Sequence, residues 1–397
     1  MKSVTNHIET IFPLIAILEI CLLISCEERF TPEIEGKDEK LLVVEGMITN
    51  LPGPYTVTLS VSSSPSEPFY TPISGYSVSI QDDAGNSETL SETDPGTYLT
   101  SLNGIQGISG RKYRLVLTSP EGKNYQTDYE MLNEPIKIDS VYAEIEYTQI
   151  DESPYQLPGY RFFVDAKEAQ NDSTCFLWRL EETYQYESDF KIYFSYFDRI
   201  VHPVINKDTL KRCWLTEKIK GFYLTNTFSL SSPEVERFPF HLVPTDNRKL
   251  SIRYSLLTWQ YVISKEAYIF WHKVIEQNTE SDDLFTKQPY QIRGNIYNPT
   301  DNGETVLGYF LTAAVSQKRI FVNRPGYPIE MYYPKCELNI NDYENYGWMF
   351  LGPAPPASNP LFVTEDANGE RALTHQACVN CLLKGGTTEK PEFWIDY

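Results

Sequence analysis

Four residues near the C-terminus have the types and the spacing of a metal or redox site. His375, Cys378 and Cys381 are separated by two residues each, and Cys336 lies upstream. Three thiolates and one imidazole form a ligand set that suits tetrahedral zinc. The same cysteines can instead form structural disulfides, or Cys378 and Cys381 can act as a redox dithiol. A redox pair of this spacing normally opens a helix that stabilises the thiolate, whereas Gly385-Gly386 closely follows this pair and predicts a turn.

An apolar segment at the N-terminus indicates the compartment of these cysteines. It runs from Ile11 to Ile24 and ends in Leu23-Ile24-Ser25-Cys26, which resembles the lipobox of bacterial lipoproteins. Cleavage before Cys26 and attachment of diacylglycerol to its sulfur would tether the mature chain to a membrane outside the cytoplasm. The segment has about 14 residues, whereas a membrane-spanning helix needs roughly 20. We therefore favour a lipoprotein signal peptide over residues 1–25, rather than a transmembrane anchor.

Five cysteines remain after the signal peptide and the lipidated Cys26, and outside the cytoplasm they tend to pair. An odd count leaves one cysteine over. Shared predicted regions suggest Cys175 with Cys213, and Cys336 with either Cys378 or Cys381. Structural disulfides are thus favoured over zinc or redox chemistry, and no metal or cofactor is expected. The disulfide candidates are Cys175, Cys213, Cys336, Cys378 and Cys381.

Composition excludes some functions and leaves others weakly supported. The formal net charge of −20 over 397 residues, without a local cluster of Lys and Arg, argues against nucleic-acid binding. The chain has no Gly-x-Ser-x-Gly, no His-Glu-x-x-His and no phosphate-binding glycine-rich loop. A glycosidase needs only two carboxylates facing one cleft, for which Glu181-Glu182 and Asp282-Asp283 are candidates. In so acidic a chain we favour solvated surface for both pairs.

The elements that must position these residues are mainly strands, because the chain is rich in Tyr, Val, Thr and Pro. Residues 26–40 are a polar tether. Short alternating segments with frequent turns predict an immunoglobulin-like β-sandwich over residues 41–132. Longer alternating segments predict a larger β domain over residues 136–322. Residues 323–397 are expected to be an irregular, cysteine-containing arm, since prolines interrupt them.

One segment of the larger domain has a helical pattern, near residues 264–280. Ser264 is a candidate N-cap, and the apolar side chains that follow recur with the spacing of one helix face. Those side chains are Ala267, Phe270, Trp271, Val274 and Ile275. Packing of this helix on the sheet is favoured over an aromatic ligand platform made of Tyr268, Trp271 and His272.

Aromatic residues also gather at Tyr184-Gln185-Tyr186 and over residues 193–197. Stacked rings of this kind can hold sugars or peptides, although most aromatic side chains in a β protein fill the core. If the protein has a ligand-binding face, the sequence places it at these two segments.

An ordered set of short segments resembles a family catalogued as domain of unknown function 4249. The resemblance implies an outer-membrane lipoprotein, anchored by lipid, that works beside a TonB-dependent transporter. It implies no activity and no catalytic residues. The segments are Leu42-Val43-Val44-Glu45-Gly46, Gly53-Pro54-Tyr55, Pro95-Gly96-x-Tyr98, Gly110-x-x-Tyr113, Ile138-Asp139-Ser140, Trp178-Arg179, Cys213-Trp214, Leu284-Phe285, Gln288-Pro289, Gly294-Asn295-Ile296, Val306-Leu307-Gly308-Tyr309-Phe310, Cys378-x-x-Cys381 and Pro391-x-Phe393-Trp394.

These observations favour a non-enzymatic cell-envelope lipoprotein that assists a TonB-dependent transporter or presents a glycan or peptide ligand to it. A structural or adhesive surface protein is the alternative, and a surface hydrolase using a carboxylate pair is a weaker one. The acidic pair Glu27-Glu28 resembles surface-export tags, and the surface and the periplasmic face of the outer membrane both stay open.

Overall fold

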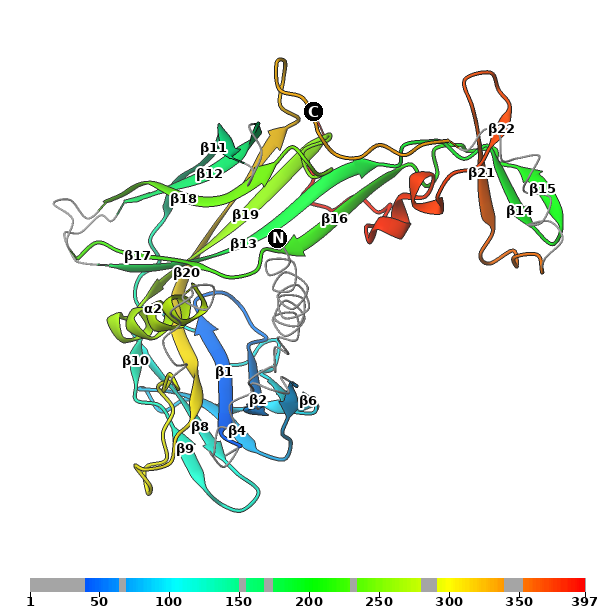
Figure 1. Ribbon diagram of the computed structural model, residues 1–397. Coiled ribbons are helices and arrows are strands. Elements are labelled where there is room, and N and C mark those ends of the chain that lie inside the picture. The colour runs from blue at the N-terminus through cyan, green and yellow to red at the C-terminus, as the bar shows by residue number, and fades with distance from the viewer. Residues whose placement is uncertain are drawn as a thin grey trace, which may run out of the picture. The chain divides into compact units, whose positions relative to one another are not determined.

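The computed structural model describes residues 40–63, 69–149, 155–167, 174–228, 234–279, 291–338 and 353–396. The signal peptide and most of the tether, including Cys26, lie outside these residues. Residues Leu41–Ser62 and Phe69–Tyr397 belong to one compact unit. The prediction of a mainly β chain is confirmed, and α2 (Lys265–Thr279) is the one α-helix among the described residues (Figure 1). No helix in the described part is both long and apolar enough to cross a membrane.

The main structural element is a ten-stranded sheet. Its strands follow the order β16-β13-β19-β20-β1-β2-β7-β6, with β17 pairing β13 and β3 pairing β2. These strands are β1 (Leu42–Thr49), β2 (Thr56–Val61), β3 (Thr71–Pro72), β6 (Ser91–Asp94), β7 (Thr97–Leu99), β13 (Cys175–Glu187), β16 (Arg212–Lys218), β17 (Tyr223–Asn226), β19 (Arg253–Ile263) and β20 (Leu307–Asn323).

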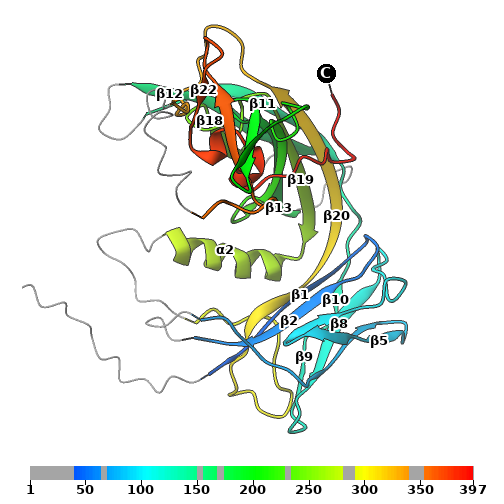
Figure 2. The same cartoon turned by 90° about the vertical axis from the view of Figure 1, so that its right-hand side faces the viewer.

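Strand β20 joins the two regions that the sequence assigned to separate domains. Its first half pairs in parallel with β1, from Val43 opposite Leu307 to Thr49 opposite Ala313. Its second half pairs antiparallel with β19. The ten-stranded sheet therefore crosses the boundary expected near residue 133, and Figure 2 shows β20 curving from β1 toward β19. Alternation in sequence reveals a strand but not its partner, which is why this pairing was not anticipated.

Two glycines allow the backbones to approach closely at this junction. Gly308 has φ +86°, and a Cβ there would lie 2.1 Å from the carbonyl oxygen of Val44. A Cβ on Gly294 would lie 1.5 Å from the carbonyl oxygen of Gly308. The Asn295 side chain then fixes β20, because its Nδ2 donates to the Phe310 carbonyl at 2.8 Å and its Oδ1 accepts from the Phe310 N–H at 2.9 Å.

A second sheet packs over the N-terminal strands and completes a sandwich-like arrangement. Its order is β10-β8-β4-β5, with β9 pairing β8. Alternate residues of β4 and β8 are buried in one core with Val57 and Leu59 of β2, including Val78, Ile80, Leu115 and Leu117. Full burial of each such side chain is worth about 1.5–3 kcal/mol. The strands are β4 (Ser77–Asp82), β5 (Ser87–Thr89), β8 (Lys112–Thr118), β9 (Asn124–Gln126) and β10 (Glu130–Met131).

The same core continues under a three-stranded sheet, β11-β12-β18, made of β11 (Ile138–Gln149), β12 (Gln156–Lys167) and β18 (Glu234–Pro244). Trp178 of β13 is its largest fully buried side chain. Its ring lies 5.0 Å from that of Phe238 and 5.5 Å from that of Phe240. Its indole N–H donates to Gln260 Oε1 at 3.0 Å, which satisfies the buried donor.

Helix α2 packs on the opposite face of the ten-stranded sheet. Ser264 is its N-cap, since its Oγ accepts from the Ala267 N–H at 3.1 Å. Ala267 and Phe270 are buried, and Trp271 and Val274 pack against the same cluster. The predicted cap is confirmed, as are four of the five predicted apolar side chains, whereas the half-buried Ile275 is not part of this cluster.

The C-terminal region is more regular than the sequence suggested. Strand β21 (Leu361–Glu365) pairs with β14 (Phe194–Phe197) and with β22 (Arg371–Ala372), and β14 pairs with β15 (Ile200–Pro203). Two 3₁₀ turns follow, η2 (Gln376–Cys378) and η3 (Cys381–Lys384). Trp394 is buried, with its ring 5.4 Å from that of Phe321 on β20.

Replacing Gly308 by Ala should destabilise the chain by about 3–4 kcal/mol, because the new methyl group meets the Val44 backbone. Gly85→Ala is the matched control. Gly85 also has positive φ, +90°, but no atom lies within 4 Å of its added Cβ, so only the conformational cost of about 1–2 kcal/mol applies. Urea unfolding of both variants measures the difference, and equal losses would contradict the close approach.

Candidate functional site

The C-terminal cysteines are paired in two disulfides, Cys213 with Cys381 and Cys336 with Cys378. Cys175 is a buried free thiol. The suggested pairing of Cys175 with Cys213 is therefore wrong. Cys213 lies opposite Tyr186, at the other end of β13 from Cys175, so the two cysteines are too far apart to bond.

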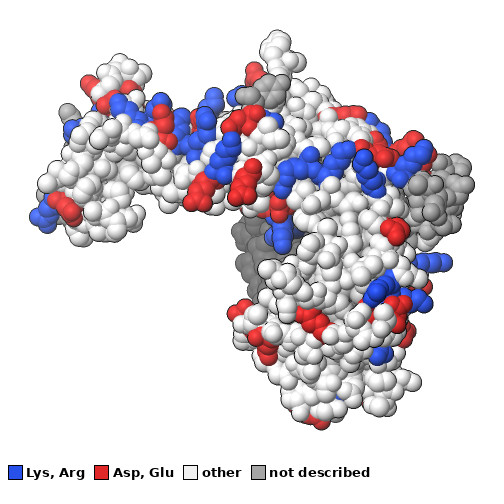
Figure 3. All heavy atoms as spheres, turned by 180° about the vertical axis from the view of Figure 1, so that it is seen from behind, with Lys and Arg blue, Asp and Glu red and all other residues white. Residues whose placement is uncertain are grey.

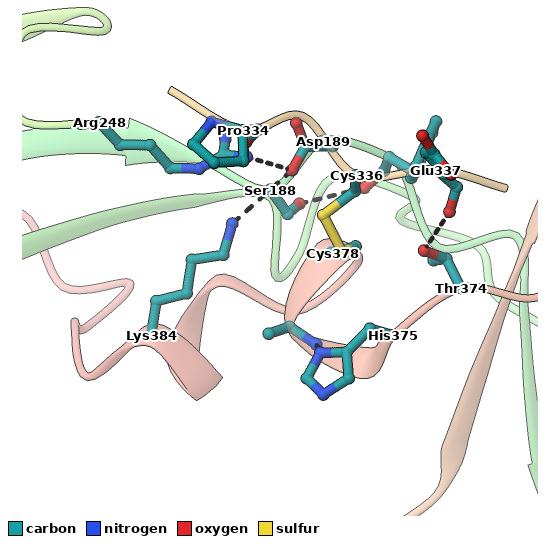
Figure 4. The surroundings of a disulfide bond; sticks show 12 residues. Ser188, Asp189, Arg248, Pro334, Cys336, Glu337, Thr374, His375, Cys378 and Lys384 are labelled. Atoms are coloured by element: carbon teal, nitrogen blue, oxygen red, sulfur yellow. Dashed lines mark hydrogen bonds and ion pairs between the residues drawn. A yellow bond between two sulfur atoms is a disulfide. The ribbon is translucent and has the colours of Figure 1, made fainter. Parts of the chain in front are cut away.

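These disulfides remove the ligands of the zinc site that the sequence offered as an alternative. Asp189 lies close to the sulfurs of Cys336 and Cys378, but its carboxylate binds Arg248 at 2.6 Å and Lys384 at 3.7 Å (Figure 4). His375 Nδ1 accepts from the Ala377 N–H at 3.3 Å and so caps η2. The cluster holds the C-terminal region in place rather than presenting ligands.

The described carboxylate pair does not face one cleft. Glu181 forms an ion pair with Arg319 at 3.2 Å. Glu182, on the other side of the strand, binds Lys249 and accepts from the Tyr254 hydroxyl at 2.9 Å. Asp282-Asp283 lies outside the described residues.

The aromatic segments that the sequence favoured as a binding face are largely core. Tyr186 is buried, and its hydroxyl donates to the Cys381 carbonyl at 2.8 Å. Tyr196 is also buried and borders a cavity of about 440 Å³ beside Pro353 and Pro355.

A larger cavity, of about 910 Å³, opens beside α2. We name it the α2 groove. Its floor is the face of the ten-stranded sheet that carries Met47, Thr58, Trp259, Tyr261, Tyr309 and Leu311. Its wall is α2, through Phe270, Trp271, Val274 and Gln277. Of the proposed platform residues Tyr268, Trp271 and His272, only Trp271 lines it.

Packing holds the groove aromatics in place. The rings of Phe270 and Tyr309 lie 4.9 Å apart, and Trp271 meets Phe222 edge-on at 4.8 Å. The indole N–H of Trp271 is buried and has no acceptor among the described residues. Rigid aromatic faces that line a cavity are typical of a preformed small-molecule site.

Two charged side chains line the groove without a hydrogen bond or ion pair to any described residue, Arg179 and Glu45. Arg179 lies across from Trp259 in the sheet, and Glu45 lies across from Tyr309. Burial raises the pKa of the Tyr261 hydroxyl, and the positive charge of Arg179 opposes that rise. Elsewhere basic side chains lie beside acidic ones over the face seen in Figure 3. Ion pairs outside the groove include Arg161 with Glu146 and Arg237 with Glu144.

The carboxyl group of Glu130 lies beside Tyr309, at the N-terminus of α2. Glu130 binds the Ser264 hydroxyl and accepts from the Thr312 N–H at 3.4 Å. Burial raises its pKa to about 7, helped by the charge of Glu266, while those two hydrogen bonds oppose the rise. The carboxyl group thus couples the start of the helix to the groove floor.

The family model described as "Domain of unknown function (DUF4249)" matches residues 27–319. The chain belongs to this family. A search of curated proteins found no match. The DUF4249 match includes both charged groove residues and all of α2, and it ends within β20.

The groove was not predicted because its parts are far apart in sequence. Glu45, Arg179 and Trp271 come from three elements whose pairing no local pattern reveals. A signal was present nonetheless, since Leu42 to Gly46 and Trp178-Arg179 were among the segments that resemble DUF4249.

Glu130→Gln should change how stability depends on pH. Because its pKa is raised, Glu130 keeps its proton in the folded chain at pH values between the ordinary range of a glutamate pKa and about pH 7. In the unfolded chain it is ionised over the same pH interval. Its contribution to stability is therefore full at low pH and is lost as pH rises toward 7. Urea unfolding at pH 5 and pH 8 should show a smaller loss with rising pH in Glu130→Gln than in the wild type.

His241, whose pKa is lowered by burial, also makes stability depend on pH. Its effect is the same in the wild type and in Glu130→Gln, so it cancels when the two are compared. Glu121→Gln, on an exposed turn, should behave like the wild type. Equal pH dependence in wild type and Glu130→Gln would contradict the placement of this carboxyl group.

Proposed function

We propose that this protein is a non-enzymatic, lipid-anchored outer-membrane lipoprotein that holds a ligand in the α2 groove and presents it to a TonB-dependent transporter. The observation that supports this is the groove itself. It combines about 910 Å³ of space, packed aromatic rings and two charged side chains that pair with no described residue. A structural or adhesive spacer needs no such groove.

Binding is favoured over hydrolysis by the side chains that line the groove. Glu45 is the one carboxylate among its described lining residues, and no histidine is among them. General acid–base hydrolysis of a glycan uses two carboxylates facing the substrate. A groove with one carboxylate, one arginine and several aromatic rings is better suited to holding a ligand than to cleaving it.

Anchoring at Cys26 supports the presenting role. A lipid tether confines the protein to the membrane and raises its effective concentration near a membrane partner. A loose interface with a transporter then suffices for delivery. The transporter as partner, and the outer membrane as location, rest on the resemblance and on the lipobox.

A mild-detergent pull-down of the tagged protein from its native envelope tests this function. A TonB-dependent transporter should co-purify, and Cys26→Ala should weaken that association because the tether is lost. Trp259→Ala should leave it intact, since the groove is assigned to the ligand. Recovery of the lipoprotein without any transporter would contradict the presenting role.

A further inference from the structure

Glu45 and Arg179, the two charged residues that line the α2 groove, lie toward its two ends. Along β20, Tyr309 lies beside Glu45, and Gln317 lies level with Arg179 through Trp259. These positions on β20 are eight residues apart, which corresponds to about 26 Å along a straight strand. Glu45 and Arg179 also lie three strands apart across the sheet, which adds about 14 Å sideways. The curvature of β20 (Figure 2) shortens the overall separation. The groove is therefore negative at one end and positive at the other.

Between these ends the groove is apolar and aromatic. Trp259, Tyr261, Phe270 and Leu311 line it. A ligand that fits needs an apolar body, a cationic end and an anionic end. Both charged side chains are exposed, and opposite charges at the two ends of a ligand attract them more strongly than the hydroxyl groups of a neutral sugar.

We propose that the α2 groove binds a short peptide with free ends, its α-ammonium group at Glu45 and its α-carboxylate at Arg179. This inference rests on the proposed function and names its ligand class. Arginine is suited to the carboxylate because its guanidinium group can donate two parallel hydrogen bonds. The apolar side chains of the peptide pack on the aromatic rings that line the groove.

The distance between the charges sets the length of the peptide. An extended chain advances about 3.3–3.6 Å per residue, so about six to eight residues span the groove. A dipeptide cannot reach both charges at once. Affinity should therefore rise with length up to this range and then stop rising.

Calorimetric titration of the purified mature chain tests the proposal. The probes are synthetic peptides of alternating phenylalanine and serine, two, four, six and eight residues long. Each is made with free ends, with an acetylated N-terminus, and with an amidated C-terminus. The six- or eight-residue peptide with free ends should bind best, and blocking either end should weaken binding about tenfold.

Two variants assign each end to its residue. In Arg179→Gln, amidation should no longer weaken binding, while acetylation still does. In Glu45→Gln the reverse should hold. Arg324→Gln, at an exposed arginine outside the groove, should retain both effects, and Trp259→Ala should weaken all peptides.

Any of three results would overturn the peptide assignment. They are absence of peptide binding, equal affinity for free and blocked ends, and end effects that persist in both Arg179→Gln and Glu45→Gln. The pull-down decides separately on presentation. Peptide binding without a co-purified transporter would leave the ligand class standing, and a transporter without peptide binding would leave the presenting role standing.

Discussion

The rest of the structure depends on the parallel pairing of β1 with β20. This pairing brings together residues more than 250 positions apart, such as Val44 and Gly308, and so carries a loop-closure cost. Burial of Val44, Ile48 and Phe310 in the common core offsets that cost. The glycine at position 308 permits the close approach, and the Asn295 side chain holds the strand in register. Without this contact the N-terminal sandwich and the larger sheet would be separate units.

The same contact creates the α2 groove. Strands β1 and β2 supply one part of its floor, β19 and β20 supply the other, and α2 forms its wall. Each contributing part is individually ordinary, with alternating strands and an amphipathic helix. Glu45 and Arg179 line one cavity only because the sheet is continuous. The disulfides lie outside the groove and tie the C-terminal region to β16 and to the segment after β20.

Sequence patterns predicted the local elements well. Period-two alternation located β2, β4 and β8, and the Ser264 cap with its apolar face located α2, because these signals depend on neighbours in the chain. Partners across the sheet could not be predicted. Cys213 bonds with Cys381 because β16 runs beside η3, and Arg179 reaches the groove because β13 pairs with β19. Long-range pairing depends on the shape of the whole core, and the periodicity of a single sequence carries no information about that shape.

Residues 41–132 expressed alone would test most directly whether β20 is required to join the molecule. The structure predicts that this fragment lacks a cooperative thermal transition. In the fragment β1 keeps β2 but loses β20, its partner over seven residue pairs from Val43–Leu307 to Thr49–Ala313, and the core loses Phe310. Circular dichroism recorded during heating measures whether the fragment unfolds cooperatively. A fragment that melts cooperatively at the temperature of the whole chain would contradict the account and would restore an independent N-terminal domain.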